Sequence, residues 1–181
     1  MTAEGRNVAT PRQDELYQDA GRQFGDALGR LARGYEEDPE RRRDLLQEIH
    51  LALWQSFAHF DGRCSLRTWV YRVAHNVATS HVIRDRRFRS RMLVGLDGID
   101  TADTGTNEYL LDQHLALEKL LRLIQRLRPT DRQVILSYLE GLDAAATAEI
   151  TGFSAGSVAT RIHRIKQILA RQFHDGGSHV E

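Results

Sequence analysis

Residues 60–91 read FDGRCSLRTWVYRVAHNVATSHVIRDRRFRSR, and they predict a long amphipathic helix that starts near Ser65. A serine placed before a helix caps it by accepting a hydrogen bond from a free backbone N–H of the first turn. Apolar residues then recur at helical spacing on one face, namely Leu66, Val70, Val73, Ala74 and Val77. A different side of the same helix collects Trp69, Arg72, Asn76, Ser80 and Arg87. We therefore expect a helix with a core side and a polar, cationic side.

The polar side of this predicted helix is strongly basic. Residues 63–91 contain eight arginines, Arg63 among them, and one acidic residue, which gives the segment a charge of +7. Arginines neutralise phosphates, and aromatic rings and amide groups contact bases that have left the duplex stack. The pattern favours a surface for single-stranded or unstacked DNA. The alternative is an arginine-rich helix that only faces solvent.

Composition narrows the fold class. The chain has 181 residues, enough for one or two small domains, and it lacks runs of alternating β-branched residues, so we expect an all-α protein. Cys64 is the only cysteine, which excludes an intramolecular disulfide and a multi-cysteine metal site. The chain opens with no signal peptide and has no apolar run of about 18 residues. These features predict a soluble intracellular protein.

The charge is sorted along the chain although the formal net charge is zero. Residues 92–118 hold six acidic residues and no lysine or arginine, whereas residues 159–181 hold four basic and two acidic residues. Two basic segments around an acidic spacer imply an elongated polyanion as partner. Glycines within residues 92–112 predict a flexible linker there, and this acidic linker could cover the basic helix when DNA is absent.

Two helices are predicted before the basic one. The first starts at the capping box Thr10–Gln13 and runs to about Gly34, and Asp38-Pro39 marks the start of the second. The second helix has one apolar face, made of Leu45, Leu46, Ile49, Ala52, Leu53 and Phe57. Its other face mixes apolar with acidic and amide side chains, namely Asp44, Gln47, Glu48, Leu51, Trp54 and Gln55. Such a mixture indicates a protein-docking surface; the alternative is a helix buried on two sides of a bundle.

The second half of the chain predicts a helix-turn-helix. A helix starts around Gln113 with an apolar stripe at Leu117, Leu120, Leu121, Ile124 and Leu127, and a capping box at Thr130–Gln133 opens the next helix. Asp143 can cap a short helix, a turn follows at Thr151–Phe153, and Ser154 can cap the last helix. The outward residues of that last helix are Ser157, Thr160, Arg161 and Arg164. In such motifs these positions enter the major groove, where arginine bonds guanine.

Other site types find little support. His50, His59, His75 and His81 lie around Cys64 in the sequence, but their spacings give no ligand pair at i, i+4, so no metal is expected. His81 is better interpreted as a core residue, and oxidant sensing by Cys64 lacks a partner cysteine. There is no phosphate-binding glycine loop, no nucleophile with an orienting base and no acid pair, so we expect neither enzymatic activity nor a cofactor.

These motifs together resemble the extracytoplasmic-function (ECF) sigma factors of the bacterial sigma-70 family. In the first half the matching segments are Asp44–Glu48 with Trp54, Phe60–Arg63, and Ser65–Ala74 followed by Asn76. In the second half they are Arg132–Val134, Leu139–Leu142, Ala148–Ile150, Gly156–Val158 and Thr160–Arg164. Their order and separation fit along residues 12–173, and together they are highly specific.

The resemblance implies two small helical domains with separate tasks. Residues 10–91 would be a region-2-like domain that docks on the β′ clamp helices of core RNA polymerase and holds melted bases of the minus-ten promoter element. Residues 92–112 would be the linker, and residues 113–173 a region-4-like domain that reads the minus-thirty-five element as duplex. Residues 174–181 would be a tail. The implied partners are core polymerase (β′ clamp helices and β flap), promoter DNA and an anti-sigma factor or other regulator, in the bacterial cytoplasm without membrane insertion.

The residue assignments follow the same division. The resemblance assigns polymerase docking to Asp44, Gln47, Glu48, Leu51 and Trp54. It assigns contact with the melted strand to Arg63, Trp69, Arg72, Asn76, Ser80 and Arg87. Duplex readout falls to Ser157, Thr160, Arg161 and Arg164. The chain departs from the family at Arg42 and Arg43, where acidic residues are usual, and at Ala159, where lysine is frequent. Two alternatives stay open: a stand-alone helix-turn-helix regulator with an N-terminal dimerisation or effector domain, and an interaction adaptor.

Overall fold

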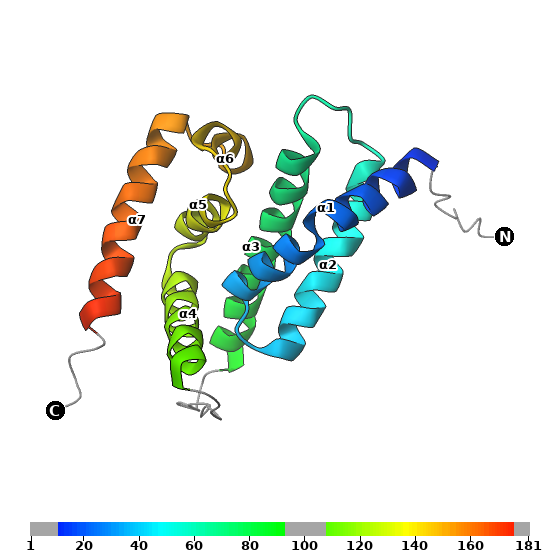
Figure 1. Ribbon diagram of the computed structural model, residues 1–181. Helices are drawn as coiled ribbons and strands as arrows, with labels where there is room; N and C mark the ends of the chain where they lie inside the picture. Colours follow the sequence, from blue (N-terminus) through cyan, green and yellow to red (C-terminus); the bar gives the residue numbers. More distant parts are fainter. Residues whose placement is uncertain (1–10, 93–107, 176–181) are drawn as a thin grey trace.

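The computed structural model describes residues 11–92 and 108–175, and within these residues every element is an α-helix. The helices are α1 (Pro11–Tyr35), α2 (Pro39–Phe57), α3 (Leu66–Met92), α4 (Glu108–Arg126), α5 (Pro129–Leu139), α6 (Ala144–Thr151) and α7 (Ala155–Asp175). Figure 1 shows them as two groups, α1–α3 and α4–α7. The all-α prediction is confirmed. None of the helices in the described ranges is long and apolar enough to cross a membrane.

The first group packs around the inward face predicted for α2. Asp38 caps α2 by accepting a hydrogen bond from the Arg41 backbone N–H at 2.9 Å, and Pro39 follows at the first helical position, where no N–H is required. The buried residues of α2 repeat at helical spacing toward α1 and α3: Leu45, Ile49, Leu53 and Phe57. The local signals therefore place α2 and its core side as the sequence predicted.

The second group contains the predicted helix-turn-helix, formed by α6 and α7. Asp143 accepts a hydrogen bond from the Ala146 N–H at 2.7 Å and so caps α6. Gly152 ends α6 in the left-handed region at φ 77°, a conformation that costs other residues free energy because of their Cβ. The Ser154 hydroxyl then accepts from the Ser157 N–H at 3.2 Å at the start of α7. All three predicted end signals are confirmed.

The predicted capping box at the start of α5 is wrong. The helix begins at Pro129, its N-cap position is Arg128, and no side chain among the described residues caps it. Proline at the first helical position starts the helix with its fixed φ and missing N–H. Thr130 and Asp131 therefore lie inside the first turn rather than before it. The Asp131 carboxylate turns instead toward α7.

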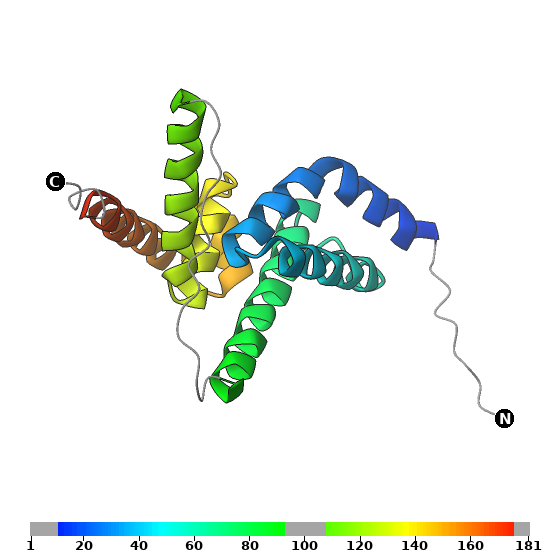
Figure 2. The same cartoon turned by 90° about the horizontal axis from the view of Figure 1, so that it is seen from below.

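The two groups also pack directly against each other, which the sequence did not predict. Helix α3 lies against α6, and α1 lies against α4 and α5 (Figures 1 and 2). Where α1 meets α5, a Cβ built on Gly34 would lie 2.5 Å from a methyl carbon of Leu136, so only glycine fits there without displacement. Buried residues of both groups form one continuous core.

The region between the two groups lies largely outside the described residues. The predicted linker covers residues 92–112, of which 93–107 are not described, so its proposed contact with the basic helix lies outside the described part. Helix α4 already begins at Glu108, earlier than the predicted start near Gln113. At the other end, α7 extends to Asp175, past the predicted start of the tail.

Candidate nucleic-acid interface

The N-terminus of α3 fixes the orientation of the basic helix. Ser65 accepts a hydrogen bond from the Thr68 N–H at 3.0 Å, as predicted. Val70 and Ala74 then face the core with no exposed surface. Because this face is buried, the opposite side of α3 is turned outward, and Asn76, Ser80 and Arg87 are exposed. Three of the six residues predicted to contact a melted strand are thus accessible on one side of α3.

The other three residues of that set have partners within the protein. The Trp69 indole N–H donates to the Ser56 hydroxyl at 2.9 Å, and its ring meets Phe60 edge-on with centroids 5.2 Å apart. Trp69 is therefore anchored between α2 and the loop before α3. Arg72 lies 4.0 Å from Glu149 on α6, at the junction of the two groups.

Arg63 is highly exposed, with 90% of its side-chain surface accessible. It lies in the loop before α3, and its Nε is 2.9 Å from the Asp61 carboxylate. Such a pair at the surface contributes little to stability. The arginine can therefore exchange this carboxylate for a phosphate at small cost.

A groove of about 380 Å³ between α2 and α3 joins two residue sets that the sequence treated separately. Asn76 and Ser80 line it from α3, and Glu48 and Leu51 line it from α2. Leu51 is 57% exposed, which is high for a leucine on an ordered helix. The groove thus places the predicted strand-binding and polymerase-docking residues side by side.

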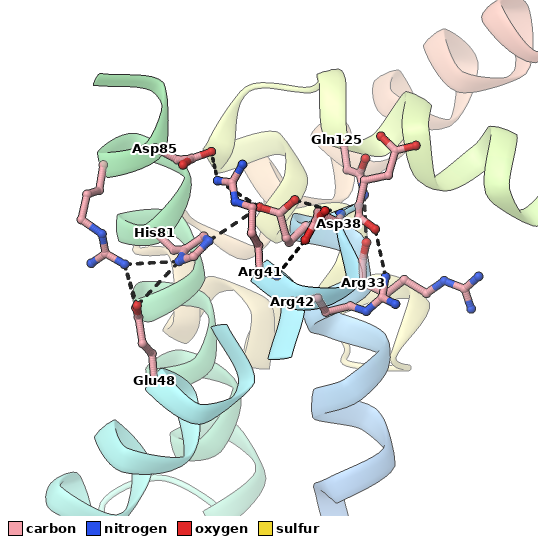
Figure 3. Close-up of polar contacts among 11 residues, drawn as sticks. Arg33, Asp38, Arg41, Arg42, Glu48, His81, Asp85 and Gln125 are labelled. Carbon is pink, nitrogen blue, oxygen red and sulfur yellow. Dashed lines mark hydrogen bonds and ion pairs between the residues drawn. The ribbon is translucent and has the colours of Figure 1, made fainter. Parts of the chain in front are cut away.

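Of the remaining residues predicted to dock polymerase on this face of α2, two are exposed and two have hydrogen-bond partners within the protein. Asp44 and Gln47 are exposed. Glu48 accepts hydrogen bonds from Arg84 at 2.7 and 2.9 Å and lies next to His81, as Figure 3 shows. Trp54 donates its indole N–H to Asp14 of α1 at 3.0 Å. Helix α1 therefore covers one end of this face.

Arg42 and Arg43, the residues that depart from the family pattern, contact acidic residues that lie three to five positions earlier in the sequence. Arg43 pairs with Glu40, and Arg42 donates to the Glu37 carbonyl at 3.2 Å. Nearby, Arg41 pairs with Glu36 and also with Asp85, and Figure 3 shows the contact with Asp85. The hydrogen bond to Asp85 is the main cause that raises the pKa of Arg41 above its usual value. Part of the excess positive charge at the start of α2 is therefore balanced locally.

On α7 the four residues predicted to read duplex DNA occupy different environments. Thr160 is exposed, and its hydroxyl donates to the Gly156 carbonyl at 3.0 Å. Ser157 is half-buried. Arg161 and Arg164 both donate to the carboxylate of Asp131 on α5. The two arginines are thus held together by an acid from another helix.

The sequence interpretation missed two exposed residues on α7. His163 and Gln167 are exposed and lie within hydrogen-bond distance of each other, with 3.0 Å between their side-chain nitrogens. Helical spacing was the available signal, because Thr160, His163 and Gln167 follow one another at i+3 and i+4.

The sequence also missed the polar contacts that join the two groups of helices. His75 is fully buried, with its Nδ1 2.9 Å from the Tyr35 hydroxyl and its Nε2 3.0 Å from the Ser137 hydroxyl. Burial lowers the pKa of His75 to about 3, so the ring is neutral.

A second polar contact between the groups centres on Glu140. Its carboxylate accepts two hydrogen bonds from Arg30, at 2.9 and 2.7 Å. The pKa of Tyr71 is raised to about 12, mainly because the side chain is buried and also because the negative charge of Glu140 is close by.

Comparison with protein families and solved structures gives a consistent result. The family model for sigma-70 region 2 matches residues 22–88, and the model for sigma-70 region 4 matches residues 117–169. The ECF RNA polymerase sigma factor SigX of Bacillus subtilis is 29% identical over 140 residues, covering 75% of this chain and 72% of SigX. The RNA polymerase sigma-E factor of Streptomyces avermitilis is 30% identical over 143 residues, covering 77% and 74%.

Two solved structures share the fold over most of the chain. One is CnrH in complex with the cytosolic domain of CnrY, with a TM-score of 0.65, 23% identity and 92% of each chain covered. The other is the sigma factor RpoE in complex with the anti-sigma factor NepR from Bartonella quintana, with a TM-score of 0.68, 19% identity and coverage of 88% and 96%.

Proposed function

The chain belongs to the sigma-70 family as an ECF sigma factor that directs RNA polymerase to promoters, and from this premise we propose how its surfaces divide the work. Residues 10–91 dock on the β′ clamp helices and hold the melted minus-ten element. Residues 113–173 read the minus-thirty-five element as duplex and contact the β flap, and residues 92–112 connect the two. The chain acts by binding, without chemistry of its own.

The groove between α2 and α3 is the observation that carries the first assignment. Strand separation becomes less costly when an unpaired base enters a pocket and cations hold the displaced strand. Asn76 and Ser80 line the groove, and Arg87 is exposed on the same helix. Trp69 and Arg72 from the start of α3, and Arg63 from the loop before it, complete the proposed strand-binding set.

The docking assignment rests on the exposed part of α2. Asp44, Gln47 and Leu51 are the accessible members, and Glu48 and Trp54 lie at its edges with partners in the protein. An apolar side chain surrounded by polar groups fits a protein partner. Because Arg42 and Arg43 retain cationic groups close by, we expect weaker electrostatic attraction to polymerase than an acidic segment would give.

Use of both DNA-binding surfaces requires the two groups of helices to separate. The two promoter elements lie about 25 base pairs apart by their names, which is about 85 Å along duplex DNA at roughly 3.4 Å per base pair. Arg72 of the first surface, however, lies 4.0 Å from Glu149 of the helix-turn-helix. We infer that the packed arrangement is a resting form and that promoter engagement opens it.

The proposed location and a further partner follow from the function. A promoter-directing subunit works where RNA polymerase is, so we propose a cytoplasmic location in bacteria. The two solved relatives are complexes with CnrY and with the anti-sigma factor NepR. By analogy we propose that an anti-sigma protein or a similar regulator binds this chain.

Runoff transcription with purified core polymerase tests the proposal. Promoters would first be selected from a randomised duplex library, and permanganate would report unpaired thymines. We expect start-site-specific transcripts and an opened minus-ten segment only when chain and core enzyme are both present. Tight binding to a palindromic duplex without polymerase, and no specific transcript, would instead identify a stand-alone regulator.

A further inference from the structure

We propose that Asp131 is a positioning residue for duplex readout: it fixes the guanidinium groups of Arg161 and Arg164 and so sets how strictly α7 discriminates its promoter element. This inference rests on the proposed role of α7 in reading the minus-thirty-five element. It adds a residue from α5, outside the helix-turn-helix, to the determinants of sequence preference.

One carboxylate serves both arginines. The Asp131 Oδ1 lies 2.9 Å from the Arg161 Nη1 and 3.2 Å from the Arg164 Nη2, and its Oδ2 lies 3.1 Å from the same Arg164 nitrogen. The Asp131 side chain is only 12% exposed. Charge-assisted hydrogen bonds to an enclosed carboxylate restrict the guanidinium groups more than a solvated surface pair would.

The two arginines are held to different degrees. The Arg161 guanidinium carbon also lies 4.1 Å from the Phe153 ring centroid, and its side chain is 31% exposed, against 55% for Arg164. Arg161 is thus fixed from two sides. Arg164 bonds Asp131 through Nη2, and arginine carries donors on three nitrogens, so its other donors remain for a base edge or phosphate.

The Asp131 carboxylate contacts side chains of α7 rather than capping the start of its own helix. Asp131 lies in the first turn of α5, where a negative charge is favourable, but no described side chain caps that helix. Arg161 and Arg164 are three positions apart on α7, a spacing at which like charges repel. The carboxylate between them offsets that repulsion and keeps both cations on one side of the helix.

Loss of the Asp131 charge should change affinity and preference in opposite directions. In Asp131→Asn the arginines become mobile, uncompensated cations. Attraction to any phosphate backbone then increases, and the salt dependence of binding steepens by about one charge. Base discrimination decreases because a bidentate contact requires a fixed guanidinium. A purely structural residue would weaken both kinds of binding together.

The test uses holoenzyme reconstituted from the full chain and core polymerase. The probes are a duplex library randomised across the upstream element, one selected duplex and the same duplex with that element scrambled. For Asp131→Asn we expect tighter, more salt-dependent binding to the scrambled duplex and about a tenfold loss of preference for the selected one. Glu15→Gln removes the same charge from an exposed position of α1 that has no part in the proposed surfaces, and should leave the preference unchanged.

Two further measurements separate the possible causes. In a chain carrying Arg161→Ala and Arg164→Ala, Asp131→Asn should have no additional effect on preference. An unchanged preference in the single variant, or a parallel loss of both affinities with a lowered melting temperature, would overturn the positioning role. If wild-type holoenzyme selects no upstream sequence at all, the proposed function of α7 fails instead.

Discussion

His75 is the residue that most directly ties the two groups of helices together. Its ring lies between the hydroxyls of Tyr35 on α1 and Ser137 on α5, and it has no exposed surface. A neutral imidazole has one donor and one acceptor, which these two hydroxyls can satisfy. Protonation would place a positive charge in this buried position without water around it, so the His75 ring stays neutral while the two groups are packed together.

We predict that acid separates the two groups through His75. The pKa of His75 is about 3 in the packed form, against 6.5 when exposed, so the separated form binds more protons. The stabilisation is complete above pH 6.5 and declines as the pH falls toward 3. Between pH 7.5 and pH 5.5 the separation equilibrium should rise about tenfold, measured as the distance between dyes on α2 and α7.

A matched variant isolates this residue from the other titrating groups. The groups that face His75 are Tyr35, whose pKa is raised mainly by burial, and Tyr71, whose pKa is about 12; Arg132 lies over the Tyr35 ring. The tyrosines stay neutral and Arg132 stays charged in this pH window. His75→Gln keeps an amide donor and acceptor, and should lose the pH response. An equal response in this variant would contradict the role of His75.

Leu51 gives a residue-scale test of the polymerase assignment. Leu51→Ser removes an apolar side chain that is already exposed in the free protein, so stability should change little. Affinity for core polymerase should fall by about 2 kcal/mol if this side chain is buried on docking. Gln23→Ser, on an exposed position of α1, is the control. Equal polymerase affinity for both variants in a titration would exclude Leu51 from the interface.

Arg161→Ala remains a prediction of the sequence, and the structure adds a second expected effect. The variant should weaken binding at the upstream element by about 1–3 kcal/mol. It should also lower the stability of the helix-turn-helix, because Arg161 contacts Asp131 and Phe153. Promoter selection and thermal unfolding report the two effects separately. An unchanged sequence preference would count against direct readout.

At the scale of elements, two glycines provide opposite tests of helix formation. Gly21 lies within α1 and Gly152 ends α6, and a Cβ added at either position would meet no atom within 4 Å. Gly21→Ala should stabilise by about 0.5–1 kcal/mol because alanine loses less entropy in a helix. Gly152→Ala should destabilise by about 1–2 kcal/mol because of its φ of 77°. Urea unfolding measures both; the same sign for both would contradict this account.

Element boundaries were largely predictable, because capping and helix termination depend on residues a few positions apart. Asp38, Ser65, Asp143 and Gly152 act as the sequence indicated. The exception is α5, where Pro129 provides a stronger start signal than the capping box that follows it. The stripe predicted for α4 is incomplete for another reason: Leu117 lines an open groove against α7 instead of the core.

At the scale of the molecule, the contact between the two groups should be separable from the folding of each. Gly34→Val places methyl groups where Leu136 now packs, since even a Cβ would lie 2.5 Å from its methyl carbon. We expect the halves to separate with helix content retained, giving a larger radius of gyration in solution scattering. Gly21→Ala on the same helix should leave the radius unchanged. A compact Gly34→Val protein would show that the interface adapts to the side chain.

The sequence by itself determined the helices, most of their caps, the helix-turn-helix and the sigma-factor resemblance. These features depend on short-range spacing and on motifs that can be recognised in order along the chain. The candidate residues Asn76, Ser80 and Thr160 were also found in this way, and they are exposed.

Only the tertiary structure decided which of those residues have partners inside the protein. The pairing of Asp131 with α7, of Trp54 with Asp14, and of His75 with Ser137 joins residues 30 to 62 positions apart. Helical periodicity tells which face a side chain occupies but not which other helix covers that face. That choice depends on how helices α1 to α7 fill one core together, and a local pattern contains no information about it.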